Sequence, residues 1–383
     1  MFFVFDGGTG IGHLRRLARI AKRLQGPFSC LIVTGHRAAA HWFVPEECEY
    51  IHLPSWDSLL ESKARYWGRR PFLLLEESEA LLLRKKILSA VVEAFVPDVI
   101  FVDHLPLGMR EELADIINQT RCVKYLVTRG LLNESDNLRH LTLGRKAQDY
   151  LRSYYHKILV ASDKRVVDFS KQYEVSSDIG AKTVHTGYIA ESVPPDIIKR
   201  TRDERRLAKD DIWVVASAGG GQRGEELIEA CLNLANHRKD IVFDIVVGPR
   251  SGLPWKEDHT LIIRENIRLH KEVTHMPFLH ASADLVISSG GYNSLLEALQ
   301  GNAKILCFPF WKDQRDEQFQ HATSLKKFVG IEVSTDVSDL PGLFERAVSS
   351  LDGNGAQDRR RELDFNGVAN IERIVLRDIA LDS

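Results

Sequence analysis

Cysteine is scarce in this chain of 383 residues: there are five, widely scattered, and no two of them form a CxxC pair. This pattern excludes a disulfide framework and a zinc knuckle, and it favours a reducing, cytoplasmic setting. Charge of one sign is also lacking, because 51 lysines and arginines face 53 aspartates and glutamates, for a formal net charge of -2. The balance gives no indication of a nucleic-acid partner, so any anion-binding site must be local.

Long apolar runs are missing too. No stretch approaches the ~18 uninterrupted apolar residues of a membrane-spanning helix, so we expect no transmembrane segment. The apolar opening covers residues 2–5, without a basic region or a cleavage site, and it predicts a first strand rather than a signal peptide. Residues 67–88 combine basic ends with two leucine runs, which leaves two alternatives: core packing with solvated flanks, or peripheral contact with a membrane or lipid acceptor.

Short apolar runs alternate with amphipathic stretches in two successive halves of the chain. Such runs are typical of buried parallel strands, and the stretches between them, such as 13–24 and 110–119, predict crossover helices. The expected strands are 2–5, 30–35, 99–104, 122–127, 157–162 and 183–188 in the first half, and 212–217, 241–248, 267–273, 284–289, 303–310 and 330–334 in the second. The sequence therefore predicts an α/β protein of two Rossmann-like, doubly wound domains.

The boundary between the halves is expected near residue 192, because Pro194, Pro195 and the charged run that follows interrupt both periodicities. We predict an N-terminal domain over 1–192, a second domain over 193–360 and a C-terminal helix over 361–383. This last helix could pack back on the first domain. Two such sheets would present the carboxyl ends of their strands to a shared cleft, where open α/β folds bind ligands.

A glycine-rich loop follows the first expected strand and includes Gly10 and Gly12. Such a loop lets a ligand approach the backbone and the amides at the start of a helix. Its spacing is not GxGxxG and no acidic residue ends the second strand, which argues against NAD. His13 opens the helix, and its ordinary pKa of ~6.5 suits a general base. The alternative is that His13 only caps or packs the helix start.

Two further polar residues end strands of the first half. Asp103 could orient the imidazole of His13 and stabilise its cationic form, or it could cap the helix that follows. Arg129 could meet a phosphate or an acceptor carboxylate, or it could be a surface arginine on a loop.

The second half repeats the pattern of glycine turns between strand and helix. Gly219, Gly220 and Gly221, followed by Gln222 and Arg223, predict a cradle for a diphosphate rather than a plain tight turn. Further along come a second glycine turn, a carboxylate two turns into the next helix, and a polar pair that opens a later helix. These residues are Ser289, Gly290 and Gly291, then Glu297, and then Glu317 and Gln318.

In this order the motifs resemble those of the GT-B glycosyltransferases, and most closely family 28, which includes the N-acetylglucosaminyltransferase of lipid II synthesis. They also resemble a group of predicted glycosyltransferases with a GxGHLRR loop. The resemblance covers most of the chain, although only short motifs carry it. This chain reads GGGQRG where the lipid II enzyme reads GGSQG, and Glu317-Gln318 where that enzyme has two glutamines. The donor sugar is therefore left open.

The resemblance implies a role for each motif. Main-chain groups near Phe278 would meet a uracil, and the turn at Gly290 and Gly291 would hold the diphosphate together with the loop at 219–222. Glu297 would bind the ribose, Glu317 and Gln318 the sugar, and Asn293 is also placed on the donor side. The expected co-substrate is a nucleotide diphosphate sugar, with UDP as the expected nucleotide and a small-molecule or lipid-linked acceptor.

No DxD tripeptide occurs in the chain. This fits a leaving diphosphate that helix N-termini stabilise, so we predict no metal and no further cofactor. The expected reaction is an inverting transfer with His13 as the base. Two alternatives stay open: a nucleotide-sugar hydrolase similar to the UDP-sugar hydrolase of pseudaminic acid synthesis, in which water replaces the acceptor, and a nucleotide-sugar-binding protein without catalysis.

Overall fold

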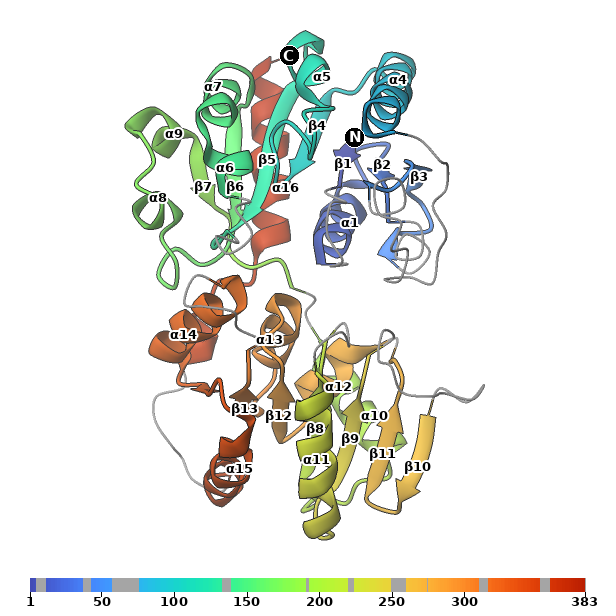
Figure 1. Ribbon diagram of the computed structural model, residues 1–383, viewed down its shortest axis with the longest axis vertical. Helices are drawn as coiled ribbons and strands as arrows, with labels where there is room; N and C mark the ends of the chain where they lie inside the picture. The colour runs from blue at the N-terminus through green and yellow to red at the C-terminus, as the bar shows by residue number, and fades with distance from the viewer. Residues whose placement is uncertain are drawn as a thin grey trace. The chain divides into compact units, whose positions relative to one another are not determined.

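The chain forms two compact units in a computed structural model, the first from Met1–Ile189 with Asp364–Ser383 and the second from Ala190–Leu363 (Figure 1). The expected boundaries were at 192 and 360. The structure describes residues 1–4, 12–36, 43–56, 76–132, 139–190, 193–219, 224–248, 260–273, 275–309, 316–351 and 359–382.

The first unit contains a seven-stranded parallel sheet with the strand order β3-β2-β1-β4-β5-β6-β7. Its strands are β1 (Phe2–Phe3), β2 (Leu31–Thr34), β3 (Glu49–His52), β4 (Val99–Asp103), β5 (Val123–Arg129), β6 (Lys157–Ala161) and β7 (Thr183–His185). Strand β3 was not expected from the sequence, because its residues are exposed or half-buried and lack the apolar signature of the central strands.

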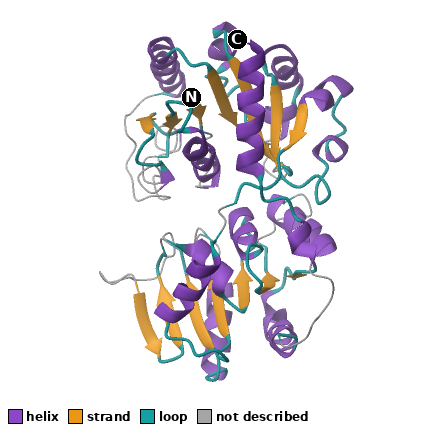
Figure 2. Cartoon of the chain, turned by 180° about the vertical axis from the view of Figure 1, so that it is seen from behind, coloured by secondary structure: helices purple, strands orange, loops and turns teal. Residues whose placement is uncertain are grey.

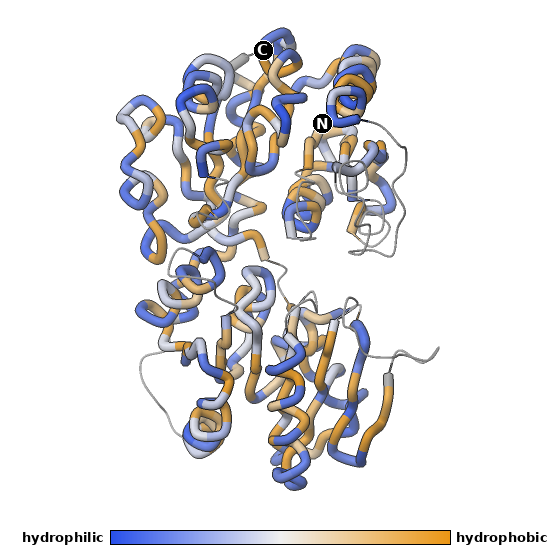
Figure 3. The backbone as a smooth tube through the Cα atoms, viewed as in Figure 1, coloured by the Kyte–Doolittle hydropathy of each residue, from blue (hydrophilic) through white to orange (hydrophobic). Residues whose placement is uncertain are grey.

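Helices cover both faces of this sheet, as a doubly wound fold requires. They are α1 (Gly12–Leu24), α4 (Glu77–Phe95), α5 (Ala114–Gln119), α6 (Arg139–Leu143), α7 (Arg145–Tyr154), α8 (Phe169–Gln172), α9 (Ser177–Lys182) and α16 (Gly367–Asp382). Alternate strand residues feed two separate cores: Phe2 packs with α1 and α16, and Phe3 packs with α4, α5 and α7. Figure 3 shows the resulting concentration of hydrophobic residues in the strands.

The C-terminal helix α16 belongs to the first unit and lies across one face of its sheet (Figure 2). It begins at Gly367 rather than at 361, after a short 3-10 turn, η3 (Arg359–Glu362). Ile371 and Val375 are fully buried against α1 and the sheet. The carboxylate of Asp378 accepts a hydrogen bond from the Tyr125 hydroxyl at 2.8 Å. The last helix is therefore part of the first domain's core.

One predicted helix begins later than the sequence suggested. Residues 110–119 were expected to be helical, but α5 begins at Ala114 because Glu111 has a positive φ of 60° and Glu112 turns inward. The buried carboxylate of Glu112 accepts hydrogen bonds from the Arg84 guanidinium at 3.1 Å and the Trp56 indole at 2.9 Å. A buried carboxylate needs such partners, and here they override the helical periodicity.

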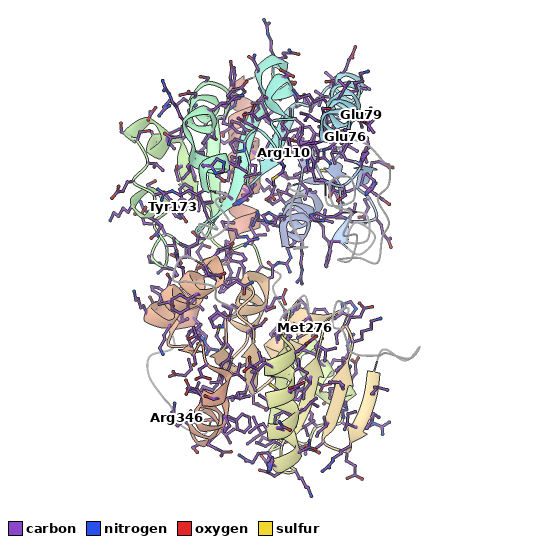
Figure 4. The ribbon with its side chains drawn as sticks, viewed as in Figure 1. Glu76, Glu79, Arg110, Tyr173, Met276 and Arg346 are labelled. Carbon is purple, nitrogen blue, oxygen red and sulfur yellow. The ribbon has the colours of Figure 1, made fainter. Side chains whose placement is uncertain are left out.

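Helix α4 carries the second leucine run and has one buried face, formed by Ala80, Arg84, Leu88 and Val92. Figure 4 places Glu76 and Glu79 at its start, where they form a capping box. Leu88 and Val92 are buried in the sheet core, while Leu82 is exposed. In the part of the chain that the structure describes, no helix is long and apolar enough to cross a membrane.

The second unit contains another seven-stranded sheet, with the order β10-β11-β9-β8-β12-β13-β14. The strands are β8 (Trp213–Ser217), β9 (Val242–Val246), β10 (Thr260–Arg264), β11 (Ile267–His270), β12 (Leu285–Ser288), β13 (Lys304–Cys307) and β14 (Glu332–Val333). The sheet is parallel except for β10, which pairs antiparallel with β11 and was not predicted. A short turn between these two strands permits the antiparallel hairpin.

The helices of the second unit are α10 (Pro195–Glu204), α11 (Glu225–His237), α12 (Met276–Ser282), α13 (Tyr292–Ala298), α14 (Glu317–Val329) and α15 (Leu340–Ser349), with a 3-10 turn η2 (Val337–Asp339). Apolar residues of α11 and α15 pack on one face of the sheet. The charged run after Pro194, which was expected to interrupt the periodicity, instead forms α10 of the second unit. Pro195 occupies the first turn, where its fixed φ favours a helix and its missing N–H costs nothing.

Candidate functional site

Three residues that the sequence singled out come together at the carboxyl edge of the first sheet. His13 lies in the first turn of α1, Asp103 ends β4 and Arg129 ends β5. Strands β1, β4 and β5 are neighbours in the sheet. Their carboxyl ends therefore meet at one edge, together with the helix that follows β1.

The imidazole of His13 and the carboxylate of Asp103 form a direct hydrogen bond. Nδ1 of His13 lies 2.6 Å from Oδ2 of Asp103, and both residues are buried. An ionised carboxylate can only accept, so Nδ1 carries the proton and the lone pair of the neutral ring is at Nε2. This tautomer is the one in which Nε2 can act as a general base.

A residue that the sequence analysis overlooked, Arg16, binds the other oxygen of the same carboxylate. Its guanidinium donates a hydrogen bond to Oδ1 of Asp103, and the side chains of both residues are almost completely buried. The same Nη2 atom lies 3.2 Å from Nδ1 of His13. Arg16 follows His13 by three positions, so both occupy one face of α1. That spacing was the available signal.

The surroundings of His13 keep its ring neutral. Burial is the largest effect, and it lowers the pKa of His13. The positive charges of Arg129 and Arg16 lower it further, so that, despite the attraction of Asp103, the pKa falls from 6.5 to about 4. Burial alone would raise the pKa of Asp103, but the charge of Arg16 and the hydrogen bond from His13 prevail and hold that pKa well below its usual range. At neutral pH the pair is therefore a neutral imidazole beside an ionised carboxylate.

Arg129 reaches the other side of the His13 ring. Its Nη2 atom lies 3.1 Å from Nε2 of His13. Because Nδ1 holds the ring proton, Nε2 accepts this hydrogen bond from the guanidinium. The nitrogen that would act as the base, Nε2, therefore accepts a hydrogen bond from the Arg129 guanidinium.

A second histidine, His104, lies beside the first and was not among the expected site residues. Its ring centre is 5.3 Å from that of His13, and its Nδ1 lies 3.3 Å from the Thr128 hydroxyl. Burial and the neighbouring His13 lower its pKa well below 6.5. The backbone of His104 has a φ of 64°, which is uncommon outside glycine and recurs at functional sites. No sequence pattern indicates that conformation.

In the second unit, the two glycine turns lie at the ends of neighbouring strands. Gly219 follows β8 and has a φ of 64°, and a Cβ there would lie 3.4 Å from the Ser289 hydroxyl. The amide of Ser289 in turn donates to the carbonyl of Ser217 at 3.1 Å. Gly290 has a φ of 78°, and an added Cβ would lie 2.9 Å from Cα of Pro309. Both turns thus require glycine for backbone reasons.

The carboxylate of Glu297 lies inside the second unit rather than on its surface. The residue is 2% exposed, on α13, and Oε2 lies 3.4 Å from Nδ1 of His280. Nε2 of His280, on α12, lies 3.4 Å from the Ser217 hydroxyl at the end of β8. His280 was not expected from the sequence, and it connects the proposed ribose carboxylate to the first glycine turn.

The remaining donor-side residues lie on the helices around these turns. Phe278 is on α12, where its ring stacks on that of His275 with centres 5.1 Å apart. Asn293 is in the first turn of α13, and Gly291 is the N-cap residue. Glu317 and Gln318 open α14, and the amide of Gln318 donates to the Asp316 carboxylate at 2.9 Å. The rings of Tyr292 and His321 stack between α13 and α14.

Several predicted residues lie outside the part of the chain that the structure describes. They are Gly10 of the first loop and Gly220, Gly221, Gln222 and Arg223 of the second. Gly12 is described and is the first residue of α1. Among the described residues, no three His, Cys, Asp or Glu side chains are grouped so that they could hold a metal ion.

Comparison with known proteins gives a family match that covers most of the second unit. Residues 215–369 match the glycosyltransferase family 28 C-terminal domain. Over 185 residues the chain is 28% identical to the UDP-N-acetylglucosamine-N-acetylmuramyl-(pentapeptide) pyrophosphoryl-undecaprenol N-acetylglucosamine transferase of a Sulfurihydrogenibium species, an alignment that covers 47% of this chain and 48% of that protein. That alignment therefore spans about half the length of the transferase.

Two further similarities extend over most of the chain. An uncharacterized glycosyltransferase of Methanosarcina mazei is 24% identical over 334 residues, which cover 80% of this chain and 78% of that protein. The solved structure of spinosyn forosaminyltransferase has a TM-score of 0.63 at 13% identity and covers 99% of this chain and 98% of its own. The two-domain GT-B fold expected from the sequence is confirmed. The chain thus has the GT-B fold, and its residues 215–369 match the glycosyltransferase family 28 C-terminal domain.

Proposed function

We propose that this chain is an inverting, metal-independent glycosyltransferase that moves a hexose or amino-hexose from a nucleotide diphosphate sugar, with UDP as the nucleotide, to an acceptor hydroxyl. The observation that carries the proposal is the 2.6 Å contact between His13 and Asp103 at the carboxyl edge of the first sheet. The family 28 match supports a nucleotide-sugar donor, and the transferase relative, whose name gives a pyrophosphoryl-undecaprenol acceptor, supports a lipid-linked acceptor over a small molecule.

The proposed reaction assigns each group one role. Nε2 of His13 takes the proton of the acceptor hydroxyl while that oxygen attacks the anomeric carbon, and the bond from this carbon to the diphosphate oxygen breaks. Asp103 holds the ring and stabilises the imidazolium that forms. The glycine turns at Gly219 and Gly290 bind the departing diphosphate with main-chain amides, together with the loop at 220–223, and Glu297 binds the ribose.

A transfer assay tests the proposal. The protein is incubated with UDP-hexoses and UDP-amino-hexoses, with and without candidate acceptors, in the presence of EDTA, and the products are identified by mass spectrometry and the anomeric configuration by NMR. An inverted glycoside, formed with EDTA present and reduced at least ~100-fold in His13→Ala, is the expected result. Rapid release of free sugar without an acceptor would instead indicate the hydrolase, and full activity of His13→Ala would contradict the role of the base.

A further inference from the structure

Two cysteines of the first unit stand at matching positions on neighbouring strands. Cys30 comes directly before β2 and Cys48 directly before β3, and these strands lie side by side in the sheet (Figure 1). The strands are parallel, and their first paired residues are Leu31 and Glu49. Cys30 and Cys48 are therefore the next pair in the same register. Adjacent strands lie ~4.8 Å apart, which is within the ~4.4–6.8 Å between Cα atoms that a disulfide spans.

The side chains of the two cysteines lie on the same face of the sheet. Both belong to the core that α1 and α16 form with this face. Their thiols lie within hydrogen-bonding reach of each other. The Cys30 thiol also lies 3.6 Å from the carbonyl oxygen of Ala21, and the Gln25 amide donates to Sγ of Cys48 at 3.1 Å. The fold therefore brings the two sulfur atoms together before any bond joins them.

The two thiols differ in reactivity. The hydrogen bond from Cys30 is the largest effect on Cys48 and, together with the one from Gln25, lowers the pKa of the Cys48 thiol against the effect of burial. The same contact and burial raise the pKa of the Cys30 thiol. Burial also raises the pKa of the other three cysteines of the chain. Because the thiolate is the nucleophile in thiol chemistry, Cys48 is the cysteine that attacks an oxidant.

The pair is open only to small reagents. Cys30 is 7% exposed and Cys48 is 6% exposed. Cys30 also lines a cavity together with Leu24 and Phe28. Hydrogen peroxide is uncharged and scarcely larger than water, so this setting favours it over a bulky or charged oxidant.

We propose that Cys30 and Cys48 form a redox-modification site, at which hydrogen peroxide joins the two sulfur atoms in a reversible disulfide. The Cys48 thiolate attacks one peroxide oxygen and becomes a sulfenic acid, while the O–O bond breaks and hydroxide leaves and takes up a proton. The sulfur of Cys30 then attacks that of Cys48, loses its proton and releases the second oxygen as water. The peroxide gains two electrons, and the two thiols lose them.

The bond would lie at the amino ends of β2 and β3. This is the edge of the sheet opposite the one that holds His13 and Asp103, so the inference does not depend on the proposed function. Strand β3 is the last strand at its side of the sheet and pairs with β2. A disulfide that closes the segment 30–48 restricts the unfolded chain and should hold β3 on the sheet.

Peptide mapping by mass spectrometry tests the site. The native full-length chain is treated with hydrogen peroxide, free thiols are blocked with iodoacetamide in denaturant, and the protein is digested. We expect one linked pair of peptides, which joins Cys30 to Cys48 and is released by dithiothreitol, with the other three cysteines alkylated. A chain that is unfolded in urea before the peroxide is added should give mixed pairs. Absence of the linked pair from the native protein, or the same mixture as in urea, overturns the proposal.

Serine variants separate the roles of the two thiols. Cys30→Ser keeps a hydroxyl that can donate to Cys48 but removes the second thiol, so the sulfenic acid at Cys48 should persist and be labelled by dimedone added in urea. Cys48→Ser should give at least ~10-fold less labelling of Cys30, because that thiol stays protonated. Equal labelling in the two variants overturns the order of attack. Cys122→Ser removes another thiol of the first unit and is the matched control, in which the bond between Cys30 and Cys48 should form at the native rate.

Hydrogen exchange shows what the bond does to the fold. In the oxidised protein the amides of β3 should exchange about tenfold more slowly than in the reduced protein, while those of β8 and β12 should be unchanged. Exchange in β3 that is unchanged or faster contradicts the proposed hold on this strand.

Discussion

Arg16 and Asp103 form an almost completely buried ion pair beneath the His13 ring, so that one carboxylate oxygen is held by a guanidinium and the other by an imidazole. The pair has two physical consequences. The guanidinium keeps Asp103 ionised in a buried setting, and it places a positive charge 3.2 Å from Nδ1 of the residue that would become an imidazolium. Arg16 therefore favours the neutral form of His13 while it fixes the carboxylate that orients the ring.

Replacement of Arg16 by glutamine should raise the pKa of His13, because one of the two nearby positive charges that oppose the attraction of Asp103 disappears. The low-pH limb of the profile of kcat/KM should then move to higher pH. The variant should also lose about 3 kcal/mol or more of stability, since it leaves a buried carboxylate without its cation. Urea unfolding and a pH profile measure the two effects.

Arg23→Gln on the same helix is the control for both measurements, because Arg23 is mostly exposed. It should change the free energy of unfolding by less than about 1 kcal/mol and leave the pH profile in place. A profile that is identical in Arg16→Gln and in the native protein would show that Arg16 does not influence the base.

The native protein should keep its activity in mildly acidic solution. A general base works in its neutral form, and burial with two neighbouring arginines lowers the pKa of His13 to about 4. The value of kcat/KM should therefore stay constant well below pH 6.5, where a free imidazole is already half protonated, and fall as the pH approaches 4.

The stability of the protein should decrease over the same pH range. Below pH 6.5 His13 binds a proton in the unfolded chain but stays neutral in the folded chain, so the free energy of unfolding decreases as the pH falls toward 4. A loss of kcat/KM centred near pH 6.5, with the protein still folded, would contradict this environment of the base.

The sequence was informative about the fold wherever strands are buried on both faces. Strands β4 and β8 are buried throughout, β5 is buried up to its last residue, and all three were predicted within two residues. The edge strands β3 and β10 were missed; the described side chains of both are exposed or half-buried, which weakens the signature of a buried strand. The start of α5 was missed because the buried partners of Glu112 are distant in sequence.

The site could be predicted in part for a similar reason. His13, Asp103 and Arg129 stand at strand ends, and parallel topology alone brings strand ends together. The role of Arg16 depends on its burial at the same helix face as His13, and the amphipathic pattern of α1 predicted only a crossover helix. His104 and His280 depend on the backbone conformation and on packing between helices, which no local pattern encodes.

Glu297 provides a test of the donor assignment in the second domain. Glu297→Gln keeps the shape of a buried side chain beside His280 but removes its charge. If the carboxylate binds the ribose hydroxyls, the affinity for UDP should fall about tenfold or more, since a hydrogen bond to a charged group contributes ~1.5–3 kcal/mol. Isothermal titration calorimetry measures the change.

Glu345→Gln, which breaks an exposed ion pair with Arg238, is the control and should bind UDP as the native protein does. Equal affinities of both variants and the native protein would remove Glu297 from the ribose site.

Gly290 should tolerate no side chain, whereas its neighbour Gly291 should. An alanine at 290 would have to adopt a φ of 78° and place its Cβ 2.9 Å from Cα of Pro309, so backbone strain adds to a clash with main chain. We expect Gly290→Ala to lose about 2 kcal/mol or more of stability. At Gly291 the φ is -57° and the nearest atom to an added Cβ is the Ser294 hydroxyl at 3.7 Å, so Gly291→Ala should lose no more than about 1 kcal/mol. Chemical denaturation of the two variants gives the comparison, and equal losses would show that the turn at Gly290 is not rigid.

The C-terminal helix should be essential to the stability of the first domain, although the sequence separates it from that domain by the whole of the second. Ile371 is fully buried in the core that α16 shares with α1 and the sheet, whereas Leu376 on the same helix is 44% exposed. Truncation of a buried isoleucine removes apolar contacts and leaves a cavity, so Ile371→Ala should lose ~2–5 kcal/mol. Leu376→Ala should lose less than about 1 kcal/mol, because much of its side chain is already in water.

Hydrogen exchange should show where Ile371→Ala lowers stability: amide protection should fall in α1 and the strands of the first sheet and stay unchanged in β8 and β12. Equal stability of the two variants would mean that α16 only rests on the first domain and is not part of its core.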